Sequence, residues 1–512
     1  MTTEMENASL APRALILGLG ETGAASARWL ARQGHALRLA DTRATPPGLD
    51  ALRSALAETD TEYRLGESSF STDLLADAGM IVMSPGLAPT DAAVAPLLTA
   101  AVEQGVEVLG EIELFARALA QLAAERGYAP RVLAVTGTNG KTTVTSLTEH
   151  LLSAAGVTAR AAGNIGPAAL TALLDALDKD ELPQAWVLEL SSFQLETTHS
   201  LKCEAAAVLN VTQDHLDWHG DLASYAKSKA RLFEQTRVRI VNRDDPLVMG
   251  MIGSLEDREV RSFGRDLPTF LGDMGLDAHN DVAWLASAEP TDFEEPVTPT
   301  PRRRKNDPVL PVPRANGRLV RMMPADALRL RGTHNALNVQ AALLLARSLE
   351  LPWGPLLRSV REYAGQPHRM AFVRTIAGVD FFNDSKGTNV GASVAGLEGL
   401  GQTAVLIAGG LGKGQDFSPL VPAVARHARA VVLIGQDGPA MAQTLAESKV
   451  PCHQAASLPE AVRLAMSLAE PGDAVLLSPA CASMDMFRNY GHRGDVFAEE
   501  VRELAMERGE VA

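Results

Sequence analysis

The sequence is poor in cysteine and has no long apolar run. Its three cysteines, Cys203, Cys452 and Cys481, are too few for a disulfide framework and too scattered for a zinc site. No stretch of eighteen apolar residues occurs, and the opening segment MTTEMENASLAPR lacks the apolar core of a signal peptide. We therefore expect a protein of a reducing compartment, the cytoplasm, without membrane insertion.

Positive charge is also scarce. The chain carries 47 Lys plus Arg against 62 Asp plus Glu, a formal net charge of −15, and its longest basic run is Arg302–Lys305. A nucleic-acid-binding protein would show clustered basic residues, so we expect no nucleic-acid partner. Apolar residues make up 46% of the 512, which is enough for several buried cores. Nothing in the sequence indicates an obligate protein partner.

The chain repeats short apolar runs, glycine-rich turns and helical stretches. Such alternation predicts an α/β protein built on doubly wound parallel sheets. A polar break at 125–130 and the end of a helical stretch at 336–363 predict three domains, 1–127, 128–366 and 367–512. Residues 287–316, which include seven prolines, are predicted to be a disordered and dispensable insertion in the second domain.

A phosphate-binding loop is predicted at TGTNGKTT, residues 136–143, between the apolar run 132–135 and a helical stretch. Backbone N–H groups and the helix start would receive phosphates, Lys141 would reach the β and γ oxygens, and Thr142 could bind Mg²⁺. The loop is shorter than the usual pattern, which would place a glycine at Val135. A ligand-free helix cap with a solvated lysine is the alternative.

A second glycine pattern, GLGETG at 18–23, follows the first predicted strand, and Asp41 ends the next one. The pattern fits a dinucleotide whose ribose hydroxyl bonds Asp41, and it equally fits the diphosphate of a UDP-sugar. A tight turn without any ligand remains a third interpretation.

Charged residues follow further predicted strands. Glu189 lies inside an apolar run, where a carboxylate is costly unless a cation such as Mg²⁺ pairs with it. Asp214, His215 and Asp217 follow another strand and could serve a second ion, whereas Lys227 and Lys229 would ordinarily be solvated helix residues. In the last domain, three polar loops at 383–389, 409–414 and 478–485 follow strands and suit an anionic ligand.

Taken together, these motifs resemble the Mur ligases, the ATP-dependent amino-acid ligases of peptidoglycan assembly. The similarity rests on TGTNGKTTVTSL, GNIG (163–166), LELSSFQLETT, LNVTQDHLD, HNALN (334–338), NDSKGTNVG and LLSPACASMDMFRNYGHRG. LELSSFQLE with SPACASMD is typical of the D-glutamate-adding members. The resemblance implies a UDP-binding Rossmann-like N-terminal domain, a central P-loop ATPase with a mainly parallel sheet and a Rossmann-like amino-acid-binding C-terminal domain.

The implied reaction joins D-glutamate to UDP-N-acetylmuramoyl-L-alanine through an acyl phosphate, with ATP and two Mg²⁺ ions. The implied catalytic residues are Lys141, Asn164, Glu189, His215 and Lys229; the metal site takes Thr142, Glu189, His215 and Lys229, the lysine as a carbamate. The implied ATP site comprises Gly137, Thr138, Asn139, Gly140, Lys141, Thr142, Thr143, Asn335, Arg369 and Asp384. The implied UDP site comprises Gly20, Glu21, Thr22, Asp41, Thr42 and Arg43, and the D-glutamate pocket Lys386, Thr388, Lys413, Ser483, Met484 and Tyr490.

Two positions depart from the family pattern: Leu411 stands where an aspartate is common, and Tyr490 where a phenylalanine is common. Three other functions are considered. A folylpolyglutamate synthase-like ligase fits poorly with GLGETG and SSFQL. An NAD-dependent dehydrogenase leaves the phosphate loop, Glu189 and His215 without a role, and a non-catalytic UDP-sugar sensor is disfavoured by the same residues and Lys141.

Overall fold

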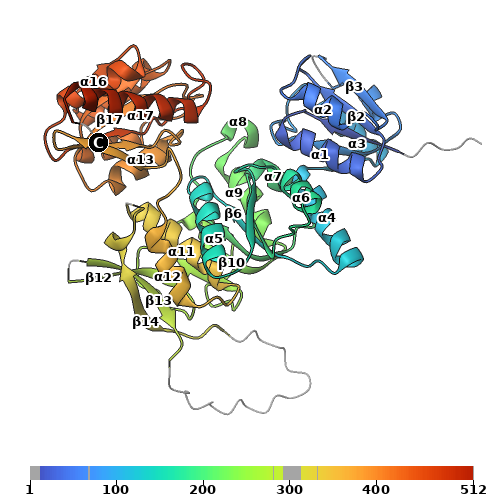
Figure 1. The fold of residues 1–512 in the computed structure, drawn as a ribbon, viewed down its shortest axis with the longest axis horizontal. Helices are drawn as coiled ribbons and strands as arrows, with labels where there is room; N and C mark the ends of the chain where they lie inside the picture. Colours follow the sequence, from blue (N-terminus) through green and yellow to red (C-terminus); the bar gives the residue numbers. More distant parts are fainter. Residues whose placement is uncertain (1–11, 67–69, 281, 292–312, 331, 511–512) are drawn as a thin grey trace, which may run out of the picture. The chain divides into compact units, whose positions relative to one another are not determined.

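The computed structural model describes residues 12–66, 70–280, 282–291, 313–330 and 332–510 (Figure 1). Its contacts divide the chain into two compact units. The first comprises Met1–Gly137, Ala155–Val208 and His215–Ile240, and the second Thr138–Ala154, Leu209–Asp214 and Val241–Ala512. In the described ranges no helix is both long and apolar enough to span a membrane.

The N-terminal region, blue in Figure 1, is a parallel sheet with the strand order β3-β2-β1-β4-β5. Alternate residues of its central strand enter two different cores, Ile16 in one and Leu15 with Leu17 in the other, because a doubly wound strand is buried on both faces. Its strands are β1 (Arg13–Leu17), β2 (Leu37–Asp41), β3 (Thr61–Leu65), β4 (Ala78–Met83) and β5 (Glu107–Leu109). Its helices are α1 (Glu21–Arg32), α2 (Leu49–Ala55), α3 (Ala95–Gln104) and α4 (Glu111–Arg126).

The second sheet has the order β11-β10-β9-β6-β8-β7. Val135 of β6 is in register with Glu189 of β8, so the loops after these strands start at the same edge. Its strands are β6 (Arg131–Thr136), β7 (Ala159–Gly163), β8 (Ala185–Glu189), β9 (Cys203–Val208), β10 (Thr236–Asn242) and β11 (Val260–Phe263). The helices along this stretch are α5 (Lys141–Ala154), α6 (Ala169–Asp178), α7 (Ser192–Glu196), α8 (Leu216–His219), α9 (Leu222–Ala230) and α10 (Pro246–Met249).

A three-stranded antiparallel sheet, β12 (Met274–His279), β13 (Val282–Glu289) and β14 (Arg318–Pro324), occupies the region of the predicted insertion. The predicted start at 287 is wrong, because 287–289 complete β13 and Ala288 is fully buried. Near the other end, Arg314 is buried and pairs with Asp273 at 2.7 Å. Residues 292–312, the rest of the predicted insertion, lie outside the described residues.

The stretch 336–363 is two helices rather than one, α11 (Thr333–Arg347) and α12 (Trp353–Glu362). Pro352 stands immediately before α12, where proline cannot donate the backbone hydrogen bond that a continuous helix would need.

The C-terminal sheet has the order β15-β16-β20-β17-β18-β19, and β15 is its antiparallel strand. Because β16, β20 and β17 are neighbours, the three predicted polar loops follow adjacent strands. The strands are β15 (Ala371–Ile376), β16 (Val379–Asn383), β17 (Ala404–Gly409), β18 (Ala428–Ile434), β19 (Cys452–Gln454) and β20 (Ala474–Leu477). The helices are α13 (Val390–Gly399), α14 (Leu420–His427), α15 (Gly438–Leu445), α16 (Leu458–Leu468) and α17 (Tyr490–Glu507). The predicted α/β class with three sheet-based domains is confirmed.

Candidate active site

The glycine-rich loop before α5 is fixed by the segment that follows β9. The Thr138 N–H donates to the Asn210 carbonyl at 2.9 Å, and the Asn139 N–H donates to Asn210 Oδ1 at 2.8 Å. Lys141 folds back and donates from Nζ to the Thr138 carbonyl at 2.9 Å. At Gly140 φ is +86°, and a Cβ there would lie 2.4 Å from Asn338 Oδ1, so only glycine fits. The sequence thus builds a preformed loop at a helix start, as phosphate binding requires.

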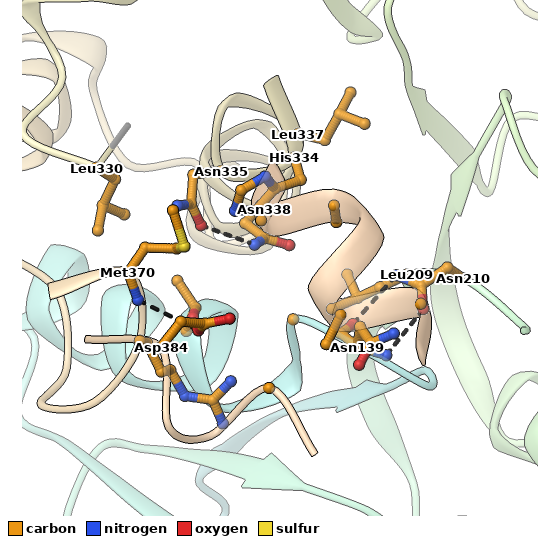
Figure 2. Close-up of a pocket in the computed structure, with 18 of the residues that line it drawn as sticks. Asn139, Leu209, Asn210, Leu330, His334, Asn335, Leu337, Asn338, Met370 and Asp384 are labelled. Carbon is orange, nitrogen blue, oxygen red and sulfur yellow. Dashed lines mark hydrogen bonds between the residues drawn. The ribbon is translucent and has the colours of Figure 1, made fainter. Parts of the chain in front are cut away.

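A cavity of about 280 Å³ lies beside this loop (Figure 2). It is bounded by the loop, the segment after β9, the start of α11 and the loop after β16. Six residues predicted for the ATP site line it: Asn139, Gly140, Thr143, Asn335, Arg369 and Asp384. Lys386, predicted for the amino-acid pocket, lines it too, whereas Gly137, Thr138, Lys141 and Thr142 are not among its lining residues.

Asp384 is a buried acid at the wall of this cavity. Its carboxylate accepts from the Met370 N–H at 3.2 Å and from Ser478 Oγ at 2.8 Å. Burial raises the pKa of Asp384 to about 7, although the Ser478 hydroxyl and the charge of Arg369 act in the opposite direction. Near neutral pH this carboxyl group therefore gains or loses its charge, and it does so at the wall of the cavity where a ligand would bind.

Several polar residues of the cavity were missed by sequence reasoning. Asn210 accepts the Asn139 N–H, and Asn338 donates from Nδ2 to Asn335 Oδ1 at 3.2 Å. Asn389 does not line the cavity itself but donates from Nδ2 to Asn139 Oδ1 at 3.1 Å. His334 also lines the cavity, and burial lowers its pKa to about 4, so the imidazole is neutral. All four lie inside motif runs of the sequence, LNVTQ, HNALN and NDSKGTN. Their motif membership was the available signal.

The three polar loops of the C-terminal region contact one another. The Ala480 N–H donates to the Gly387 carbonyl at 2.9 Å, and Leu411 and Ala482 exchange two backbone hydrogen bonds. The Leu411 pairing uses only main-chain atoms, so leucine is accommodated where the family often has aspartate. Lys386 Nζ lies 3.8 Å from the centre of the Tyr490 ring, a cation–π contact. Of the other predicted pocket residues, Ser483 is buried, Thr388 half-buried, and Lys413 and Met484 exposed.

Glu189 ends β8 and is buried. Asn164 of the GNIG loop donates from Nδ2 to Glu189 Oε1 at 2.7 Å, so two predicted catalytic residues are in direct contact. The other oxygen, Oε2, is buried and has no hydrogen-bond partner in the described structure. An unsatisfied buried carboxylate oxygen is costly, and a cation would satisfy it, so this residue fits a Mg²⁺ ligand.

The two lysines of α9 differ sharply in environment. Lys227 is exposed, whereas Lys229 is 1% exposed and donates from Nζ to the Gly137 carbonyl at 3.0 Å. The Lys229 ammonium also lies 4.3 Å from the centre of the Tyr225 ring. The orientation of α9 thus buries one of two lysines that the sequence alone left equal.

His215 stands at the N-cap of α8 with φ of +53°, and its ring contacts Phe193 at 4.8 Å between centroids. The described residues hold no group of three or more His, Cys, Asp or Glu side chains suited to a metal. This is compatible with Mg²⁺, which often takes one or two protein carboxylates together with water and substrate phosphates.

In the N-terminal glycine turn, Asp41 is already fully used by the protein. Its carboxylate accepts from the Leu19 N–H at 2.7 Å, from the Arg43 backbone N–H at 2.8 Å and from two guanidinium nitrogens of Arg43 at 2.9 and 2.7 Å. Burial opposes the charge, but the hydrogen bonds from Arg43 and Leu19 outweigh it and lower the pKa of Asp41. Asp41 is therefore committed to Arg43 and is not arranged to receive a ribose hydroxyl, which argues against the dehydrogenase interpretation. The half-exposed Arg43 guanidinium is held ready for an anion.

The other predicted UDP-site residues lie at the start of α1 and after β2. Gly20 is the N-cap of α1, and Glu21 in its first turn accepts the Ala168 N–H at 3.1 Å. A Cβ at Gly23 would lie 2.0 Å from the Gly18 carbonyl oxygen, so this third glycine of the pattern serves helix–strand packing. Thr22 is half-buried and Thr42 exposed.

Comparisons with known proteins agree along the whole chain. Three families match: the N-terminal domain of MurD-like Mur ligases at residues 12–110, the Mur ligase middle domain at 135–283 and the Mur ligase glutamate ligase domain at 368–481. The UDP-N-acetylmuramoylalanine–D-glutamate ligase of Bordetella bronchiseptica is 65% identical over 512 residues, with both chains fully covered. The chain belongs to the MurD-type Mur ligases. The enzyme of the same name from Burkholderia thailandensis is 54% identical, covering 97% of this chain and 98% of its own.

Solved structures support the fold of this Mur ligase. The MurF ligase of Thermotoga maritima, solved with ADP, has a TM-score of 0.55 at 13% identity and covers 97% of this chain and 100% of its own. The MurC ligase of the same organism has a TM-score of 0.54 at 16% identity, covering 96% and 100%. The resemblance inferred from the motifs is confirmed, and membership of the family implies the use of ATP.

Proposed function

We propose that this chain joins D-glutamate to UDP-N-acetylmuramoyl-L-alanine and cleaves ATP to ADP and phosphate, as a step of peptidoglycan precursor synthesis. The observation that supports it most is full-length identity of 65% to a relative named for this activity. The preformed glycine loop beside a polar cavity of about 280 Å³ is consistent with it. We expect the reaction in the cytoplasm, where ATP is available and the three free thiols stay reduced.

The chemistry follows from the need to activate a carboxylate. A carboxylate oxygen of the L-alanyl group attacks the γ-phosphorus of ATP, the new O–P bond forms and the bond to ADP breaks. The amine of D-glutamate then attacks the acyl carbon, loses a proton and expels phosphate. We assign Lys141 and the backbone N–H groups of residues 140–143 to the phosphates, because they offer positive charge where negative charge accumulates, whereas the N–H groups of Thr138 and Asn139 already donate to Asn210.

We propose Thr142, Glu189, His215 and Lys229 as the protein residues that hold Mg²⁺. The ion would supply positive charge to the phosphate oxygens during transfer. The unsatisfied Oε2 of Glu189 supports its part in this set. For Lys229 to contribute an oxygen, its neutral amine would add to carbon dioxide: an N–C bond forms, one proton leaves the nitrogen, and a carbamate results.

We assign the uridine diphosphate to the N-terminal turn, with Gly20, Glu21, Thr22, Asp41, Thr42 and Arg43. Arg43 is the one cation in this set, and Asp41 fixes its orientation. We assign D-glutamate to Lys386, Thr388, Lys413, Ser483, Met484 and Tyr490, where two lysines would meet a dicarboxylate. Asn335, Arg369 and Asp384 are assigned to the adenosine side, because all three line the cavity beside the glycine loop.

The test is phosphate release from ATP with UDP-N-acetylmuramoyl-L-alanine and Mg²⁺, with D-glutamate, L-glutamate, meso-diaminopimelate or L-lysine added in turn. We expect release with D-glutamate alone, and a product heavier by one glutamyl residue. Release with another amino acid would keep the ligase chemistry and overturn the assigned pocket. No release from folded protein with any of them would overturn the function.

A folylpolyglutamate synthase-like activity is the remaining alternative. The folylpolyglutamate synthase of Mycobacterium tuberculosis has a TM-score of 0.52 at 17% identity and covers 75% of this chain and 95% of its own, a likeness that shows the fold alone. A reduced folate in place of the UDP-substrate, with L-glutamate, is therefore a useful additional arm of the same assay, and we expect no phosphate release in it.

A further inference from the structure

His219, a histidine outside the proposed catalytic set, is hydrogen-bonded at both ring nitrogens. Its Nε2 lies 2.9 Å from Ser192 Oγ, and its Nδ1 lies 3.3 Å from Ser228 Oγ. The Ser228 hydroxyl in turn bonds the carboxylate of Glu196. Both serines are 2% exposed. We call this chain, Ser192–His219–Ser228–Glu196, the His219 relay.

The relay has a definite direction. A serine hydroxyl has one hydrogen, and two acceptors compete for that of Ser228: the Glu196 carboxylate and the Ser224 carbonyl at 3.0 Å. The charged carboxylate is the stronger acceptor, so Ser228 donates to it. Ser228 Oγ can then only accept from His219, which places the imidazole hydrogen on Nδ1. In the neutral imidazole Nε2 is left as an acceptor, and the Ser192 hydroxyl donates to it. The carboxylate thereby selects one tautomer of His219.

The relay joins two segments that carry proposed site residues. Ser192 and Glu196 are the first and last residues of α7, which begins three residues after Glu189. Ser228 belongs to α9 and directly precedes Lys229. His219 therefore ties α7 to α9 from the short helix α8 between them.

Ring packing reinforces the same connection. The His219 ring stacks on Phe193 of α7, with an interplanar angle of 14° and centroids 5.5 Å apart. It also contacts the Tyr225 ring of α9 at 5.1 Å, and that ring carries the Lys229 ammonium at 4.3 Å. A shift of His219 would thus reach Lys229 both through Ser228 and through Tyr225.

We propose that His219 is a positioning residue for Lys229: the relay sets the pose of α9 against α7 and so aims Lys229 Nζ toward the Gly137 carbonyl at the start of the phosphate loop. The proposal rests on the proposed function for its catalytic consequence, since Lys229 is there a metal-site residue. It also explains the SSFQLE run of the sequence, whose Ser192, Phe193 and Glu196 each contact His219 or its partner.

Kinetics of conservative variants test the role. An asparagine amide sits where Nδ1 was and can still donate to Ser228, whereas a glutamine amide sits where Nε2 was and can only reach Ser192. We expect His219→Gln and His219→Ala to lower kcat about 10- to 100-fold, as losses of residues that orient ligands do. KM for the UDP-substrate should be unchanged, and His219→Asn should retain most of kcat. His279→Ala, at the exposed end of β12, is the matched control.

Combining variants separates positioning from general stability. Because His219→Ala already removes the hydrogen bond between His219 and Ser228, Ser228→Ala with His219→Ala should lose no more kcat than the worse single variant. Multiplied losses, an unchanged kcat in His219→Ala, or kcat losses that follow only a fall in Tm would each overturn the proposal.

Nitrogen-15 NMR of histidine-labelled protein tests the relay without any turnover. We expect His219 to show the signals of an Nδ1–H tautomer. These signals are assigned to His219 by their loss in His219→Asn, and they should shift in Ser228→Ala. An Nε2–H tautomer would overturn the relay. If the wild type shows the expected tautomer but no ligase activity, the proposed function falls and the relay stands, so the two failures are distinguishable.

Discussion

The N-terminal glycine turn (18–23) and the phosphate loop (136–143) each connect a strand to a helix, but their surroundings differ. In the N-terminal turn, the acid at the end of the next strand, Asp41, is buried and bound to Leu19 and Arg43. In the phosphate loop, Asn139 and Gly140 line a cavity, and the Asn139 N–H donates to the Asn210 side chain. The first turn thus presents one oriented guanidinium, whereas the second presents a helix start beside a polar cavity of about 280 Å³.

This difference teaches that a glycine pattern alone does not identify its ligand. Both turns leave backbone N–H groups at a helix N-terminus, where any phosphate can bind. At the first turn, the dinucleotide pattern requires the acid at the end of the second strand to receive a ribose hydroxyl. Here Arg43 occupies it.

The largest expected effect is at the phosphate loop. We expect Lys141→Ala to lower kcat of ligation by about 10²- to 10³-fold or more, the loss typical of removing a group that stabilises transition-state charge. Steady-state phosphate release measures it. Lys227→Ala removes an exposed lysine and should behave as wild type. Equal losses in both variants would mean that overall charge, and not the loop, is responsible.

The matching change at the other turn should affect the other substrate. Arg43→Ala removes the oriented guanidinium, and hydrogen bonds to charged groups contribute about 1.5–3 kcal/mol, so KM for the UDP-substrate should rise roughly 10- to 100-fold. KM for ATP should not change. Initial rates with each substrate varied in turn measure the split. If KM for ATP rises instead, the assignment of this turn to the UDP-substrate is wrong. NADH binding to the wild type would support the dehydrogenase interpretation.

The sequence also predicts the two turns to different extents. The phosphate loop, the three larger sheets and the neighbouring C-terminal loops were predictable, because each depends on a local motif or on strand order, whereas the antiparallel sheet β12-β13-β14 was not predicted. The choice of Lys229 over Lys227 was not, because it depends on which face of α9 is buried. The pairing of Asp41 with Arg43 was not predicted either, although the two are close in sequence, because the pattern gives no side-chain direction. The insertion was predicted to start at 287 because prolines begin at Pro290, whereas the buried run 285–288 continues β13 as far as Glu289.

A smaller effect is expected from pH at the cavity of the phosphate loop. Asp384 has a pKa of about 7, so its carboxyl is neutral below that pH and charged above it. A charged carboxylate is the stronger acceptor for a ribose hydroxyl, and KM for ATP should therefore fall roughly threefold to tenfold between pH 6 and pH 8. Asp384→Asn should show a flatter profile, which also corrects for the titration of ATP itself. An identical profile in the variant would remove Asp384 from the nucleotide site.

Near the N-terminal turn, the expected pH effect is on stability. Glu111 is fully buried, accepts the Leu170 N–H at 2.5 Å, and burial, with the charge of Glu21, raises its pKa to about 7. A carboxyl with a raised pKa stabilises the fold below its unfolded value near 4.5, and this contribution is lost as pH rises through 7. The lost stability is on the order of 3 kcal/mol.

Glu111→Gln should therefore gain several degrees in Tm relative to wild type between pH 5 and pH 8, with no change in KM for ATP. Thermal unfolding at the two pH values measures this, and Glu503→Gln, at an exposed site, is the control. A constant difference in Tm at both pH values would show that Glu111 does not titrate in this range.

The smallest effect is expected from a change near neither turn. Deleting 292–312 should leave kcat, both KM values and Tm at wild-type levels, because the described strands and the buried Arg314–Asp273 pair remain intact. Deleting 287–316 should lower Tm by several degrees, since it also removes the end of β13 and that pair; losing one partner of a buried pair costs about 3–5 kcal/mol. Thermal unfolding and ligation rates of the two deletions distinguish the contribution of the β12-β13-β14 sheet from that of residues 292–312. A folded but inactive 292–312 deletion would show that this segment takes part in the reaction.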